Sequence, residues 1–169
     1  MERLRQLFWS ESHMQDGYLH AQRGCFEVNK AVFESFSALP IKRCDVVALR
    51  KEAIFPGLRN PREMYSLALR LLLDYLVPRI ESSDDLTVVL AKWQPVPDLP
   101  ALARTVLERP TLERRVSTTV LQAPSAAHAG LQYADYLAFA SHRQRTRGEE
   151  RWLNSTRSAA RGFSDFTAF

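Results

Sequence analysis

The chain has 169 residues, 46% of them hydrophobic, which is enough for one ordinary hydrophobic core and favours one domain over residues 1–169. The formal net charge is +4, and 19 of the 23 basic residues are arginine, the side chain whose fork best matches phosphate. No apolar run approaches the roughly 20 residues that cross a bilayer, and the N-terminus lacks the apolar core of a secretory signal, so we expect a cytoplasmic protein without a membrane span.

The first half of the chain predicts a helix, a strand and a second helix. Residues 25–39 carry apolar side chains at helical spacing, and Pro40 ends the run. Residues 44–49 are short and rich in β-branched side chains, which is typical of a strand. Asn60 is a good N-cap for a long amphipathic helix over 62–80, whose apolar face would pack in the core.

The second half continues the alternation. Residues 86–90 form a continuous apolar run of strand length, the pattern of a strand buried on both faces of a sheet. A short helix over 99–108, a strand over 115–121 and a helix over 128–145 follow. This order of strands and helices predicts an α/β sheet with helical cover.

The helix over 128–145 carries titratable side chains on one stripe. His128, Asp135 and His142 are seven residues apart, so neighbours lie about 10.5 Å from each other along the axis and cannot share one metal ion. Asp135 is flanked by apolar residues, where an unpaired charge would be costly. Water, a cation or a metal could meet this carboxylate, or it could cap or form an ion pair as a purely structural group.

A cluster of basic residues follows the stripe, with an aromatic residue at its end. Such a cluster can contact nucleic-acid phosphates, and the aromatic ring could stack on a base. Cations near the carbonyl end of a helix, or the codon bias of a genome rich in G and C, explain the same pattern without a ligand. The candidate nucleic-acid-binding residues are His142, Arg143, Arg145, Arg147, Arg151 and Trp152.

Several segments together resemble a known family. Residues 130–136, with the sequence GLQYADY and preceded by Ser125, resemble the closing motif of the bacterial and phage family called domain of unknown function 3800, part of the RNase H-like superfamily. Residues 17–21, with the sequence GYLHA, are similar to an earlier His-Ala segment of that family. Lys51 and Tyr65 stand where the family has a lysine and a tyrosine.

The resemblance implies an RNase H-like mixed sheet with flanking helices, in which acidic residues bind Mg²⁺ or Mn²⁺ and activate water to cleave phosphodiester bonds. Carboxylates suit these ions, and two ions can stabilise both reacting oxygens. Asp135 is the acid that carries over to this chain, as catalytic and metal-binding residue. Its possible neighbours in the site are His20, Lys51, Ser125 and Gln132.

The sequence also departs from the family. The family's opening strand, Ile-Asp-Glu-Ser-Gly, has no counterpart in residues 1–16, which read as a variable segment and make the fold N-terminally shortened. Lys92 stands after the strand over 86–90, where the family has an aspartate. Residues 146–169 read as a basic C-terminal extension. The family's set of carboxylates is therefore incomplete.

Two functions remain in competition. The first is a metal-dependent nuclease, with further carboxylates from Glu11, Asp16, Asp45 or Asp98. The second, which the missing acids favour, is a catalytically degenerate relative that binds nucleic acid or takes part in protein assembly. An open sheet edge in a shortened fold could pair with a partner or with a second copy. A fragment of a longer protein and an unrelated α/β domain are further alternatives.

Overall fold

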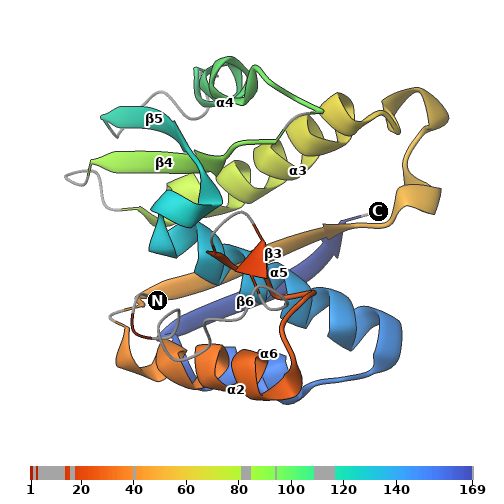
Figure 1. The fold of residues 1–169 in the computed structure, drawn as a ribbon. Coiled ribbons are helices and arrows are strands. Elements are labelled where there is room, and N and C mark those ends of the chain that lie inside the picture. The colour runs from red at the N-terminus through yellow and green to blue at the C-terminus, as the bar shows by residue number, and fades with distance from the viewer. Residues whose placement is uncertain are drawn as a thin grey trace. The chain divides into compact units, whose positions relative to one another are not determined.

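The computed structural model describes residues 18–39, 41–80, 85–93, 95–108 and 117–168, together with residues 1, 3, 14 and 15. Across these residues helices alternate with short strands, so the α/β class is confirmed (Figure 1). The described strands form three separate two-stranded sheets instead of one mixed sheet. They pair as β1 (Met14–Gln15) with β2 (Tyr18–Leu19), β3 (Arg43–Leu49) with β6 (Gly162–Ala168), and β4 (Leu86–Ala91) with β5 (Thr118–Ala123).

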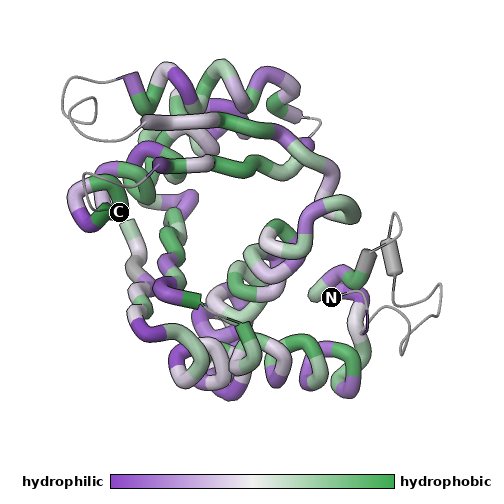
Figure 2. Tube along the Cα trace, turned by 90° about the vertical axis from the view of Figure 1, so that its left-hand side faces the viewer, coloured by the Kyte–Doolittle hydropathy of each residue, from purple (hydrophilic) through white to green (hydrophobic). Residues whose placement is uncertain are grey.

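The chain divides into two compact units, each with its own hydrophobic core. The first unit comprises Met1–Val46 and Ser125–Asp165, and the second comprises Val47–Pro124 and Phe166–Phe169. Figure 2 shows hydrophobic and hydrophilic residues alternating along the helices, as expected for helices that bury one face. None of the described helices is long and apolar enough to span a membrane.

In the first unit, α2 (Phe26–Ser35) continues as a 3₁₀ turn, Phe36–Ala38, and buries the apolar face that its spacing predicts. The helix over 128–145 is confirmed as α5 (Ala129–Arg147), with His128 at its N-cap. The buried residues of this core are Leu19, Ala21, Val28, Val32, Phe33, Phe36, Cys44, Tyr133, Tyr136, Leu137, Ala140, Trp152 and Leu153.

Residues 146–169 do not behave as an appended basic tail. They contain α6 (Arg151–Ala159), whose Trp152 and Leu153 are buried in the core of the first unit, and the paired strand β6. Gly148 ends α5 at a φ of 66°, a left-handed conformation that glycine adopts without the penalty of a Cβ. The chain therefore turns at once into α6, and an aromatic side chain enters the core.

In the second unit, α3 (Pro61–Leu76) begins as predicted, and the Asn60 side chain accepts a hydrogen bond of 3.0 Å from the backbone N–H of Glu63. The α-helix ends before residue 80 and continues as a 3₁₀ turn, Val77–Arg79. The reason is Pro78, which has no N–H to donate to the preceding turn of an α-helix.

Strands β4 and β5 are parallel, with Leu86 opposite Thr118. The expectation that β4 is buried on both faces is wrong, because Leu90 is buried whereas Thr87, on the other face, is exposed. The core of this unit consists of Leu69, Leu73, Leu90, Val96, Val120 and residues of α4 (Leu99–Leu107), namely Leu99, Ala103 and Val106. The predicted strand over 115–121 appears as β5, and residues 115 and 116 lie outside the described residues.

Candidate functional site

Asp135 lies midway along α5 and contacts the segment that follows β2. Its Oδ2 accepts a hydrogen bond of 3.2 Å from the backbone N–H of Ala21 and lies 3.9 Å from Nδ1 of His20. The carboxylate is half-buried, with 35% of its side chain exposed, so water can solvate it. The structure thus brings together two predicted site residues, His20 and Asp135. The contact anchors a remote segment on α5, a structural role that differs from the local cap or local ion pair considered from the sequence.

Of the other expected carboxylates, the two in the described part of the chain, Asp45 and Asp98, form ion pairs and no metal centre. Within the described part of the chain, no three His, Cys, Asp or Glu side chains form a group that could hold a metal ion. Asp45 is paired with Arg43 at 2.7 Å, and Asp98 is paired with Arg62 at 2.6 Å. The hydrogen bond from Arg62 lowers the pKa of Asp98. Two further candidates, Glu11 and Asp16, lie outside the described residues.

Gln132 and Ser125, two other predicted neighbours, also meet. The buried Gln132 donates from Nε2 to the carbonyl oxygen of Ser125 at 3.0 Å, which holds the 3₁₀ turn Ser125–Ala127 against α5. Lys51 belongs to the exposed 3₁₀ turn Lys51–Ala53 of the second unit. Lys92, also in the second unit, is exposed after β4.

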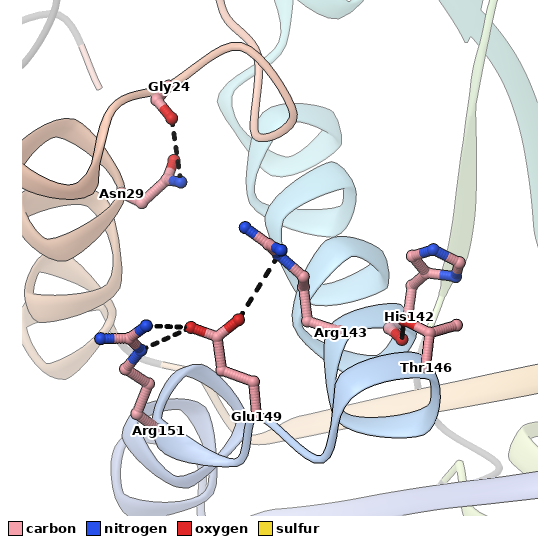
Figure 3. A network of polar contacts seen from close by, with 7 residues as sticks. All are labelled: Gly24, Asn29, His142, Arg143, Thr146, Glu149 and Arg151. Carbon is pink, nitrogen blue, oxygen red and sulfur yellow. Dashed lines mark hydrogen bonds and ion pairs between the residues drawn. The ribbon is translucent and has the colours of Figure 1, made fainter.

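The basic cluster separates into structural and available residues. Arg145 donates to both carboxylate oxygens of Asp165, at 2.8 and 2.5 Å, and also contacts the hydroxyl of Ser141. Arg143 and Arg151 flank the carboxylate of Glu149 (Figure 3). Three of the four predicted arginines therefore have acidic partners within the first unit.

The prediction that Trp152 is available for base stacking is wrong. Its ring is 5% exposed and stacks on Phe33, with ring centroids 5.1 Å apart. Phe26 packs against the same indole at 5.5 Å. An indole removes more apolar surface from water than most side chains, so it fills the core instead of facing a ligand.

A concave surface at the C-terminal half of α5 is lined by the two remaining basic candidates, His142 and Arg147, and by Arg143. It encloses about 250 Å³ and is lined by Gln22, Phe139, His142, Arg143 and Arg147; we call it the α5 pocket. His142 and Arg147 are exposed, and their side chains make no hydrogen bond or ion pair with the described residues. The described residues of the lining are two arginines, a histidine, a neutral amide and a phenylalanine, with no carboxylate among them.

Three of the five lining residues are among the sequence candidates, and two are not. Phe139 is three and four residues before His142 and Arg143, so helical spacing could have placed it beside them. Gln22 comes from a turn more than a hundred residues away in sequence, and nothing in its local sequence indicates this position.

Comparisons with family models, curated proteins and solved structures find no match to this chain. The resemblance to the domain of unknown function 3800 family therefore rests on the sequence motifs alone.

Proposed function

We propose that the first unit binds the phosphate backbone of nucleic acid at the α5 pocket and does not cleave it. The observation that carries this proposal is the composition of the pocket, in which exposed His142 and Arg147 stand beside Arg143 with no acid among the described lining residues. Guanidinium groups form charge-assisted, often paired hydrogen bonds to phosphate oxygens. The resemblance to an RNase H-like family adds independent support for nucleic acid as the ligand.

The contacts of Asp135 support a binding function over a catalytic one. This carboxylate already accepts a hydrogen bond from Ala21, and its titratable neighbour is His20, not a second acid. Two-metal cleavage needs several carboxylates around ions about 4 Å apart. The described residues offer no such group.

A metal-dependent nuclease is the second candidate, and one observation favours it. Asp135 is about one-third exposed and has an imidazole 3.9 Å away, so an ion could reach it. The additional ligands would then come from outside the described residues, with Glu11 and Asp16, which precede His20 in the sequence, as candidates. Mg²⁺ or Mn²⁺ would be the cofactor.

Titration of fluorescein-labelled oligonucleotides, followed by anisotropy, tests the proposal. Single- and double-stranded RNA and DNA of about 20 nucleotides are compared between about 50 and 200 mM salt. We expect Arg147→Ala to weaken binding about three- to tenfold. The salt slope, which is the change of log affinity with log salt concentration, should become less steep by about the amount that one phosphate contact contributes.

Arg104→Ala is the matched control. Arg104 is exposed in the last turn of α4, as Arg147 is in the last turn of α5, so both changes remove one charge from a helix end. Equal loss of affinity in the two variants would refute the α5 pocket as the binding site. Cleavage in the presence of Mn²⁺ that disappears in Asp135→Asn would replace this proposal with the nuclease.

A further inference from the structure

Glu149 lies between two arginines, one of which lines the α5 pocket (Figure 3). Arg151 donates from Nε to Oε1 of Glu149 at 2.6 Å and makes a second contact to the same oxygen. The other oxygen, Oε2, lies 3.5 Å from Nε of Arg143. The hydrogen bond from Arg151, and the charges of both arginines, lower the pKa of Glu149. A carboxylate thus occupies the space between two guanidinium groups.

The backbone after α5 places Glu149 there. With Gly148 in the left-handed region, the N–H groups of Gly148 and Glu149 donate back to the carbonyl oxygens of Gln144 and Arg143, at 3.0 and 3.4 Å. This is the hydrogen-bonding pattern of a glycine-terminated helix. It folds Glu149 back against the last turns of α5, directly before α6.

Glu149 satisfies the charge of Arg143 only in part. The Nε of Arg143 is buried and has no hydrogen-bond partner among the described residues, because the 3.5 Å ion pair to Glu149 does not fulfil the geometry of a hydrogen bond. Both hydrogen bonds to Glu149 from Arg151 use Oε1. The two non-bridging oxygens of a nucleic-acid phosphate can accept hydrogen bonds from two guanidinium groups at once.

We propose that Arg143 and Arg151 form a second phosphate position beside the α5 pocket, which Glu149 occupies until a nucleic-acid phosphate displaces it. This inference rests on the proposed function and adds to it a second phosphate contact that Glu149 blocks, which we call the masked position. Arg143 belongs to both positions, so a bound strand could place one phosphate in the pocket and the next against Arg151. Glu149 then lowers the affinity for nucleic acid by competing with the phosphate.

The experiment compares Glu149→Gln with Glu150→Gln in the full chain. Both variants remove one negative charge and are adjacent in sequence, but Glu150 is exposed and has no ion pair with the described residues. The probe is the labelled single-stranded RNA of about 20 nucleotides. We expect E149Q to bind it on the order of three- to tenfold more tightly than the wild type and E150Q to change affinity less than about twofold.

The salt dependence and a double variant identify the contact. In E149Q, Arg143 and Arg151 no longer pair with a carboxylate and can contact phosphate. The salt slope of this variant should therefore be steeper by about 0.7 for each additional phosphate contacted on a single strand. Adding Arg151→Ala to E149Q should abolish most of the gain. Should E149Q not fold, Glu149→Asp withdraws the carboxylate from Arg143 and should give a smaller gain in the same direction.

The outcomes separate this inference from the proposed function. Equal affinities of E149Q and E150Q, with R147A still weakening the wild type, would overturn the masked position and leave the α5 pocket as the site. RNA binding by E149Q alone would support the masked position in its strongest form. Absence of salt-sensitive binding in the wild type and in E149Q would overturn both proposals.

Discussion

Arg145 and Arg147 are two residues apart at the end of α5, yet their surroundings give them different roles. The guanidinium group of Arg145 is fixed by Asp165, whose side chain is only 6% exposed. The side chain of Arg147 is exposed and lines the α5 pocket. A variant in which all of these basic residues are changed to alanine together would therefore lose both folding stability and binding, and the two effects could not be separated.

Arg145→Ala should lower the free energy of unfolding by about 2 to 4 kcal/mol, because it leaves the Asp165 carboxylate nearly buried without this ion pair. Arg147→Ala should change it by less than about 0.5 kcal/mol, as is usual for an exposed side chain that makes no hydrogen bond or ion pair with the described residues. Urea denaturation followed by circular dichroism measures both. Similar stabilities of the two variants would contradict a structural role for Arg145.

Tyr136 makes stability depend on alkaline pH. Its ring is fully buried, and its hydroxyl has no hydrogen-bond partner within the described part of the chain. Burial, followed by the charges of Asp135 and Cys25, raises the pKa of Tyr136. The unfolded chain loses this proton near its ordinary pKa of about 10 while the folded chain keeps it. The unfolding free energy should therefore fall as the pH rises above about 10, and Tyr136→Phe should reduce that slope.

The control for this prediction is Tyr133, whose hydroxyl is 2.9 Å from Oγ of Ser35. At neutral pH, Tyr133→Phe should cost about 1 kcal/mol, because it removes a hydrogen bond. Tyr136→Phe should cost less, since the hydroxyl that it removes makes no hydrogen bond to a described residue. Denaturation curves at neutral pH and between about pH 9 and 11 distinguish the variants. A larger neutral-pH loss in Tyr136→Phe would show that this hydroxyl has a partner.

At the scale of elements, local patterns predict most helices, and tertiary contacts decide the rest. The spacing of Val28, Val32 and Phe33 is enough to predict both α2 and its buried face. The apolar run of β4 is not enough to predict its exposure, because exposure depends on what covers each face of a two-stranded sheet. The early end of α3 is predictable from the sequence, because Pro78 has no backbone N–H to donate within an α-helix.

The candidate site shows the same division. The basic cluster from His142 to Arg151 can be predicted from the sequence because its members lie close together along the chain. Which arginines are available is not visible, because the pairing of Arg145 with Asp165 spans twenty residues and the burial of Trp152 depends on α2. Asp135 stands out by its apolar neighbours, but its contact with Ala21 joins segments 114 residues apart.

At the scale of the whole molecule, the chain order hides the composition of the first unit. This unit joins residues from both ends of the chain, 1–46 and 125–165, and the second unit takes the middle. All five residues that line the α5 pocket precede Gly148, so sequence position alone suggests that residues 149–169 are dispensable for binding. The structure indicates the opposite, because α6 supplies part of the core that supports α5 and α2.

A chain ending at Gly148 should therefore lose RNA binding although it keeps every residue of the α5 pocket. Deletion of α6 removes Trp152 and Leu153, which are 5% and 0% exposed, and uncovers the ring of Phe33, on which Trp152 stacks. In the full chain, Leu153→Ala should cost about 2.7 to 5 kcal/mol, whereas alanine at exposed Asn154 should cost far less. Thermal melts and RNA anisotropy measured on all three chains test this dependence. A truncated chain that melts cooperatively at the wild-type temperature and binds RNA would show that the residues after Gly148 are an appendage.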